Sequence, residues 1–292
     1  MKLGLHLSNF TWGVDTPGLA AKLAEIARVA EDAGFARISV MDHFFQIPNV
    51  GPAEHEMLEA YTTLGYLASV TKRVQLGTLV TGVTYRNPAI LAKQVTALDV
   101  LSGGRAWLGI GAAWYEREHT GLGVTFPPLK ERFLRLEEAL KICLQMWSGE
   151  ASPFDGRYYQ PKETLNSPQS IQRPHPPILI GGSGEKKTLR LVAKYADMCN
   201  VSSDSPEGVK HRFEVLRGHC EAVGRDYNAI ERTIVGRFDV GRQGEKADQL
   251  VDTIGRFAEV GVQGFMGYLY GCESQATFDV MHAKVFPQIA NF

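Results

Sequence analysis

The most reactive pair of neighbouring side chains in the sequence is Asp42-His43. It directly follows residues 36–41, an apolar run typical of a strand. Histidine titrates near neutral pH, so His43 is a candidate catalytic residue that could deliver or accept a proton. Asp42 could instead cap a helix beside a structural histidine, and both interpretations stay open.

A glycine-rich loop at residues 181–184 is the second candidate. Gly181, Gly182, Ser183 and Gly184 follow a predicted strand and precede a predicted helix. Backbone N–H groups at such a joint, together with the helix dipole, suit a phosphate group. The alternative is a flexible loop, with Lys186 and Lys187 simply solvated. The strand–loop–helix context favours phosphate binding.

Small residues follow a third predicted strand. Gly111, Ala112 and Ala113 would let a flat ring approach the backbone, although such residues also pack the mouths of barrels. The aromatic residues of the same regions could line an apolar pocket or belong to the core; they are Phe44, Phe45, Trp114 and Tyr115.

Two other kinds of site find no support in the sequence. The histidines and cysteines form no HExxH motif and no compact cluster, so no metal site is expected. The GxSxG turn of a nucleophilic hydrolase is also absent.

The elements that must position these residues alternate strictly. Strands are predicted at residues 3–7, 36–41, 74–80, 106–110, 178–180, 198–201, 232–237 and 264–269. Helices are predicted at residues 17–33, 56–70, 88–101, 129–147, 186–195, 206–223, 246–260 and 275–290. Eight such units predict an α/β protein with a closed (β/α)8 TIM barrel. An open Rossmann-like sheet is less favoured, because no GxGxxG turn follows the first strand. Active sites of barrels lie at the carboxyl ends of the strands, where all three candidate segments fall.

Composition points to a small-molecule substrate by elimination. The 292 residues include 44% hydrophobic and 22% charged residues, and the net charge is −1. No overall field would steer the chain to nucleic acid or to a membrane. The start of the chain lacks a signal-peptide pattern, and the four cysteines are dispersed, so we expect reduced thiols and a cytoplasmic location. We expect one domain over residues 1–292, with a short insertion after the fourth helix at about 148–177.

Four sequence blocks together resemble the luciferase-like monooxygenase superfamily. They are SVMDHFF, GTLVTGVTYRNPAILAKQ, GGRAWLGIGAAWYEREHTGLG and PPILIGGSGEKKTLRLVAKYADMCNV. The last block is similar to the branch of coenzyme F420-dependent oxidoreductases. The resemblance covers nearly the whole chain and implies a (β/α)8 barrel with a flavin or deazaflavin across the strand ends.

The resemblance also implies roles for individual residues. Asp42 would contact the deazaflavin ring, and His43 would face the reacting centre. The Thr78–Leu79 bond would be a non-prolyl cis peptide beneath the ring, and Thr81 would lie near the pyrimidine edge of the ring. Gly181 and Gly182 match the phosphate loop of the family.

This chain departs from the family's sugar-phosphate dehydrogenases at one position. Those enzymes carry a glutamate after the fourth strand, where Trp114 stands here, with Glu116 and Glu118 in a different register. A sugar phosphate is therefore not the expected substrate. The insertion is short compared with flavin monooxygenases such as bacterial luciferase, which favours coenzyme F420 over FMN.

Three functions are consistent with these features. The first is hydride transfer between coenzyme F420 and a small organic substrate, with His43 handling the proton. The second is an FMN-dependent monooxygenase that uses reduced flavin and oxygen. The third is a non-catalytic barrel that carries a cofactor, which the presence of His43 disfavours. By family likeness we expect a homodimer formed through the helices that follow the second and third strands.

Overall fold

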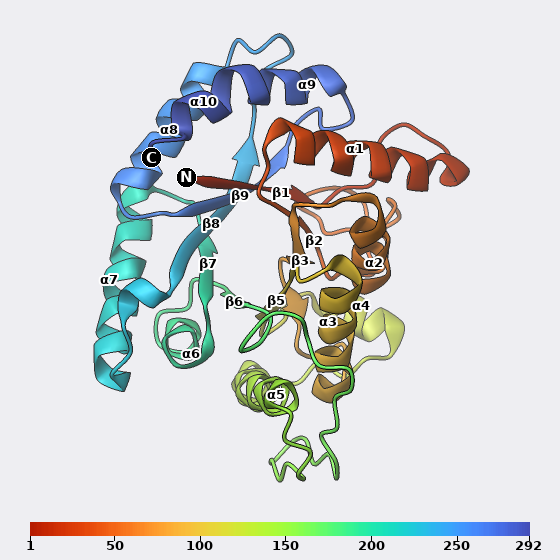
Figure 1. Ribbon diagram of the computed structural model, residues 1–292, viewed down its shortest axis with the longest axis vertical. Coiled ribbons are helices and arrows are strands. Elements are labelled where there is room, and N and C mark those ends of the chain that lie inside the picture. Colours follow the sequence, from red (N-terminus) through yellow and green to blue (C-terminus); the bar gives the residue numbers. More distant parts are fainter.

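The computed structural model describes residues 1–292, and its strands close into one parallel barrel (Figure 1). The strands are β1 (Lys2–Leu7), β2 (Arg37–Val40), β3 (Gln75–Thr78), β4 (Thr81–Gly82), β5 (Ala106–Gly111), β6 (Ile178–Gly181), β7 (Met198–Ser202), β8 (Glu231–Phe238) and β9 (Gly264–Leu269). β3 pairs with both β2 and β5, and β4 also pairs with β5, so β3 and β4 together fill one barrel position. The predicted (β/α)8 TIM barrel is confirmed.

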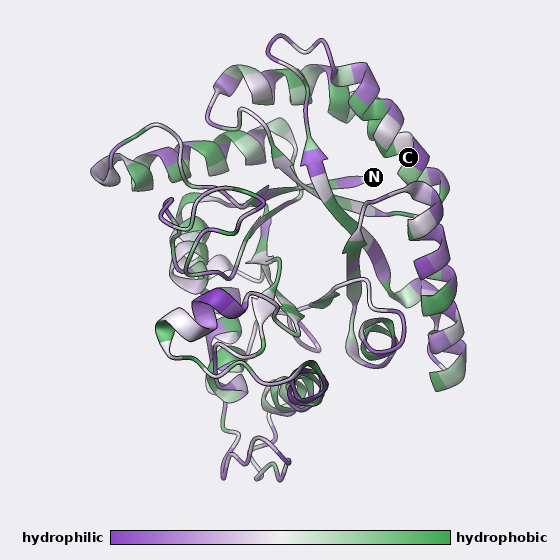
Figure 2. Ribbon diagram, turned by 180° about the vertical axis from the view of Figure 1, so that it is seen from behind, coloured by the Kyte–Doolittle hydropathy of each residue, from purple (hydrophilic) through white to green (hydrophobic).

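Helices cover the outside of the barrel between successive strands. They are α1 (Leu19–Ala33), α2 (Ala60–Val70), α3 (Pro88–Ser102), α4 (Glu116–Leu122), α5 (Leu129–Ser148), α6 (Thr188–Tyr195), α7 (Pro206–Val223), α8 (Ala247–Glu259), α9 (Gln275–Val280) and α10 (Phe286–Ile289). Hydrophobic and hydrophilic stripes alternate around these helices in Figure 2, as expected where one face packs on a sheet. No helix is both long and apolar enough to cross a membrane.

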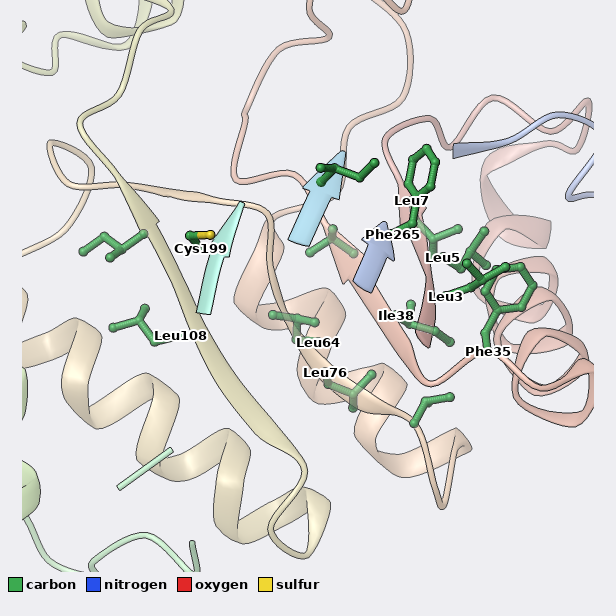
Figure 3. Packing of buried hydrophobic residues seen from close by; sticks show 14 of the residues in the cluster. Leu3, Leu5, Leu7, Phe35, Ile38, Leu64, Leu76, Leu108, Cys199 and Phe265 are labelled. Atoms are coloured by element: carbon green, nitrogen blue, oxygen red, sulfur yellow. The ribbon is translucent and has the colours of Figure 1, made fainter. Parts of the chain in front are cut away.

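The core lies between the strands and the helices. Side chains alternate along β1, so Leu3, Leu5 and Leu7 point toward the helices and are at most 1% exposed (Figure 3). The other face of β1 lies inside the barrel and carries Gly4 and His6. A Cβ on Gly4 would lie 3.2 Å from Met266 Cγ, so the barrel interior is packed with side chains rather than open.

The segment between α5 and β6 contains no helix or strand. Carboxylates on the neighbouring helices hold its backbone. Asp99 of α3 accepts hydrogen bonds from the N–H groups of Ile171 (2.7 Å) and Gln172 (3.0 Å). Glu138 of α5 accepts one from the N–H of Tyr158 (2.9 Å). These bonds tie the insertion predicted at 148–177 to α3 and α5.

The helices of the structure differ from the predicted ones in three places. The helix predicted from residue 56 begins at Ala60, because Glu59 caps it by accepting a hydrogen bond from the Thr62 N–H (2.7 Å). The short helix α4 was not predicted. The helix predicted at 275–290 is interrupted by a π-helical turn at Met281–Val285, next to Pro287, which has no N–H to donate.

The position predicted for the cis peptide bond was wrong by one residue. The Leu79–Val80 bond is cis, and the Thr78–Leu79 bond is not. Thr78 still belongs to the sheet, where it lies opposite Val40, and the Leu79 N–H donates to the Val40 carbonyl (2.9 Å). The cis bond therefore joins the two residues that separate β3 from β4.

Candidate functional site

A cavity of about 520 Å³ lies at the carboxyl ends of the barrel strands. Residues that follow β2, β3, β5 and β6 line it, together with the first turns of α5. Its lining residues are Asp42, His43, Leu79, Val80, Thr81, Gly82, Tyr85, Gly111, Ala112, Ala113, Trp114, Leu129, Phe133, Leu136, Gly181, Gly182, Gly184, Thr188, Asn200 and Val235. The position matches the one at which barrels carry their active sites.

The cavity brings together all of the predicted site residues except Thr78 and Ser183. Thr78 is buried beside it, where its hydroxyl donates to the Gly109 carbonyl (2.8 Å) and lies 2.8 Å from the Thr81 hydroxyl. Ser183 Oγ lies 2.9 Å from Ser202 Oγ. Thr78 thus supports Thr81, and Ser183 links its loop to β7.

The floor of the cavity is shaped by the absence of side chains. A Cβ on Gly111 would lie 2.9 Å from Val80 Cγ2, and one on Gly181 would lie 2.8 Å from Val80 Cγ1. Both distances are shorter than real contacts of this kind, so Val80 occupies the space that glycine leaves at these two positions. Val80 therefore packs directly on the backbone of these two strand ends.

The 181–184 loop keeps backbone donors free, although not at the predicted residue. The Gly182 N–H already donates to the Asn200 carbonyl (2.9 Å). By contrast, the N–H groups of Ser183 and Gly184 make no hydrogen bond within the chain. Gly182 has φ of +125°, a backbone conformation that residues other than glycine rarely adopt. Gly182 therefore shapes the loop, and Ser183 and Gly184 present its donors.

Asp42 is a buried carboxylate rather than a helix cap. Its Oδ2 accepts from Arg86 Nη1 (2.6 Å) and from the Gly82 N–H (3.2 Å). Arg86 also donates to Glu59 (2.5 Å). Burial raises the pKa of Asp42, although Arg86 and the Gly82 N–H act in the opposite direction. Asp42 thus joins the end of β2 to β4, beneath one edge of the cavity.

His43 lines the cavity, and one of its ring nitrogens is held from behind. Its side chain is 13% exposed, and Nδ1 lies 2.6 Å from Glu118 Oε1. The ring also packs edge-on against Trp114 and Tyr115, at centroid distances of 5.6 and 5.7 Å. Because a carboxylate only accepts, Nδ1 is the donor in this bond, and Nε2 remains available to the cavity.

Glu118 is the main site residue that the sequence did not identify. Its side chain is fully buried, and its carboxylate accepts from His43, from the Tyr85 hydroxyl and from the N–H groups of Phe44 (2.9 Å) and Phe45 (3.1 Å). Burial opposes ionisation, but the bonds from His43 and Tyr85 outweigh it, and the pKa of Glu118 is lowered. An ionised Glu118 therefore fixes both the ring of His43 and the loop that carries it.

A second histidine near the cavity is unsuited to proton transfer at neutral pH. His6 lies inside the barrel, with Nδ1 3.0 Å from Ser39 Oγ. Burial, and then the nearby charge of His43, lowers the pKa of His6 to about 4, against an opposing hydrogen bond at Ser39. His6 is therefore neutral, and His43 is the one histidine that lines the cavity.

The aromatic residues divide between the cavity and the core. Of the four that the sequence singled out, only Trp114 lines the cavity, and it is 55% exposed. Phe44 packs edge-on against Tyr85, and Tyr115 is buried under Trp114. The sequence missed several lining residues because their patterns are also those of core strands and helices: Leu129, Phe133, Leu136, Thr188, Asn200 and Val235.

Comparison with known proteins places the chain in a family. A family model described as luciferase-like monooxygenase matches residues 1–277. The F420-dependent glucose-6-phosphate dehydrogenase of Kineococcus radiotolerans is 37% identical over 224 residues, which cover 73% of this chain and 62% of that protein. The chain therefore spans less than two thirds of the length of this curated relative.

Solved structures share the whole fold at low identity. An F420-dependent secondary alcohol dehydrogenase, in complex with an F420-acetone adduct, has a TM-score of 0.83 at 18% identity and covers 99% of this chain and 98% of its own. The coenzyme F420 dependent tetrahydromethanopterin reductase from Methanopyrus kandleri has a TM-score of 0.80 at 19% identity and covers 98% of both chains. At these identities the likeness establishes the fold.

Proposed function

The chain belongs to the luciferase-like monooxygenase family, and from this membership we propose that it is an oxidoreductase that transfers hydride between coenzyme F420 and a small organic substrate. The observation that carries the proposal is the cavity at the strand ends, which is lined by Val80, by strand-end glycines and by one histidine held by a buried carboxylate. The name of the 37% identical relative supports coenzyme F420 as the cofactor.

The residues present fit such a cofactor. Leu79, Val80 and the small residues 111–113 would hold the ring, with Thr81 at its edge. The free N–H groups of Ser183 and Gly184 would hold the phosphate. When bound, the deazaflavin ring would supply or accept the hydride.

His43 would handle the proton that accompanies the hydride. Its Nε2 would protonate the substrate oxygen during reduction and remove the same proton during oxidation. Glu118 would hold Nδ1 so that Nε2 faces the substrate, and would stabilise the positive charge that the ring gains. Asp42 would keep the end of β2 in place through Arg86 and Gly82.

We propose a carbonyl compound or an alcohol without a phosphate group as the substrate. None of the residues that line the cavity is a lysine or an arginine, so a phosphorylated sugar would find no cation there. The exposed indole of Trp114 stands at the rim beside His43 and offers an apolar surface instead.

Titration of the protein with coenzyme F420 and with FMN tests the cofactor assignment. Trp114 lines the cavity, so a bound ring should quench tryptophan fluorescence. We expect saturable quenching by coenzyme F420 and turnover of a carbonyl or alcohol substrate by the complex. Tight binding of FMN with oxygen-dependent turnover would identify a monooxygenase instead, and binding without any turnover would indicate a carrier.

Replacing Gly182 by valine is expected to weaken cofactor binding at least tenfold, about 1.4 kcal/mol. Valine at φ of +125° is strained, so the loop should move, and the donors of Ser183 and Gly184 should move with it. The measurement is the Kd for the cofactor by fluorescence. Gly224→Val is the matched control, since Gly224 also has a positive φ (+69°) but follows α7, outside the cavity. Unchanged affinity in folded Gly182→Val protein would contradict the phosphate role of the loop.

We also propose that the protein is a cytoplasmic homodimer that associates through α2 and α3. Ile90 and Leu101 of α3 are 59% and 73% exposed, and both are apolar. The four cysteines are free and buried, which supports a reducing compartment.

Replacing Leu101 by glutamate is expected to shift the protein toward the monomer, with dimer affinity lowered at least tenfold. The change would bring like charges from the two subunits together at the proposed interface, and the apolar contact of Leu101 would be lost. Sedimentation or light scattering measures the change, with Val223→Glu on α7 as a control at another exposed apolar position (43% in the wild type). A wild-type protein that stays monomeric at high concentration would contradict the proposal.

A further inference from the structure

A groove lined by cations leads away from the cavity between α5 and α6. Its volume is about 260 Å³. We call it the basic groove and define it by its charged residues, which are Lys130, Glu137, Lys186, Lys187, Arg190 and Lys194. The two helices follow neighbouring barrel strands and lie next to each other in Figure 1.

Most of the positive charge in the basic groove is unpaired. Lys194 pairs with Glu137 (2.9 Å), and this is the only ion pair in the groove. The other four cations are exposed and form no salt bridge. Unpaired cations this close repel one another, so the site favours an anionic ligand. The concentration of charge is local, because the whole chain has a net charge of −1.

The basic groove adjoins the cofactor cavity. Phe133 lines both, and the Lys187 ammonium lies 5.2 Å from the centre of its ring. Lys186 and Lys187 directly follow the 181–184 loop, which keeps its N–H donors free. A ligand whose phosphate rests on that loop could therefore reach the groove past Lys186 and Lys187.

The distance between the cations along the groove favours an extended ligand. Lys187 and Lys194 stand at opposite ends of α6, seven residues apart, which corresponds to about 10 Å along a helix. A single phosphate group could not reach the cations at both ends. A chain of several anionic groups could, since each would meet a different lysine or arginine.

We propose that the basic groove binds an oligocarboxylate tail of the cofactor, beyond the phosphate held by the 181–184 loop. The inference rests on the proposed function, because coenzyme F420 is a cofactor whose phosphate carries a chain of glutamate residues. Each carboxylate would pair with an exposed cation, and the pairs would add to the affinity of the ring and the phosphate.

Three ligands of graded length test the inference. They are coenzyme F420 with its oligoglutamate tail, the same molecule with the glutamates removed, and the deazaflavin with its ribityl chain but without phosphate. We expect removal of the glutamates to weaken binding to the wild type about tenfold, as a few exposed ion pairs would. The difference should largely disappear at 0.5 M salt, where exposed charges are screened.

The double variant Lys186→Gln/Arg190→Gln should bind the tailed and tailless forms with Kd values within about threefold of each other. Arg28→Gln/Lys72→Gln, which removes two exposed cations elsewhere, should keep the tenfold difference. Melting temperatures of both variants should match the wild type, since none of the four side chains is buried.

The outcomes separate the inference from the proposed function. Equal affinity of the wild type for tailed and tailless coenzyme F420 would overturn the tail site alone. A tenfold difference that survives in Lys186→Gln/Arg190→Gln would also overturn it, by placing the tail elsewhere. Failure of all three ligands to bind would overturn the proposed function and the tail site together.

Discussion

Replacing His43 by asparagine is expected to lower kcat by about 10²–10⁴ while changing the Kd for the cofactor less than about fivefold. The imidazole lines the cavity, and its Nδ1 is already bound to Glu118, so Nε2 is the atom left to meet a substrate under the proposed function. A group that gives or takes a proton acts mainly in the transition state and contributes little to binding of the ground state. Asparagine keeps a polar side chain but cannot transfer the proton.

A purely structural His43 would give the opposite result. Its ring packs against Trp114 and Tyr115, so loss of packing would lower the melting temperature and leave turnover per folded molecule largely intact. Measuring melting temperature, cofactor Kd and single-turnover hydride transfer on His43→Asn distinguishes the two. His282→Asn is the control, because His282 also bonds through Nδ1, to the Ala33 carbonyl, on the outside of the barrel. Hydride transfer at the wild-type rate in His43→Asn would exclude His43 as the acid–base.

The barrel could be predicted because its signals are local. Alternating apolar strands and helices with a 3.6-residue period mark each βα unit, and the rule that strand ends carry the site then selects Asp42, His43 and the 181–184 loop. The structure places these residues in one cavity, as the rule requires. The single-domain organisation and the individual roles of these residues stay predictions.

The features of the site that could not be predicted depend on contacts between segments that are distant in the sequence. Glu118 lies 75 residues after His43, on a helix of seven residues whose pattern is too short to recognise. The cis bond lies one peptide after the predicted position, and the hydrogen bond from the Leu79 N–H to the Val40 carbonyl is a contact that the sequence does not reveal. The Gly182 N–H was expected to face a phosphate, but it donates instead to the Asn200 carbonyl of the neighbouring strand β7.

The same contact between distant segments yields the last prediction: Glu118→Gln should lower kcat by about 10²–10³ with little change in the Kd for the cofactor. Glutamine has nearly the same shape as glutamate but no charge. Its amide N–H can donate to Nδ1, which would shift the proton of the neutral imidazole ring from Nδ1 to Nε2. Tyr85→Phe is the matched control, because it removes another partner of the same carboxylate and leaves the bond from His43 in place. We expect Tyr85→Phe to lose less than about tenfold in kcat.

The acid stability of the same variant provides a readout independent of turnover. The pKa of Glu118 is lowered in the folded protein, so its ionised form stabilises the fold at pH values above its unfolded pKa, near 4.5. That stabilisation is lost as the pH falls through the lower, folded pKa. Wild type should therefore be more stable than Glu118→Gln at pH 7, and the difference in unfolding free energy should shrink below about pH 4.5. A constant difference across this range would show that folding does not lower the pKa of Glu118. A wild-type kcat in the variant would show that Glu118 does not position His43.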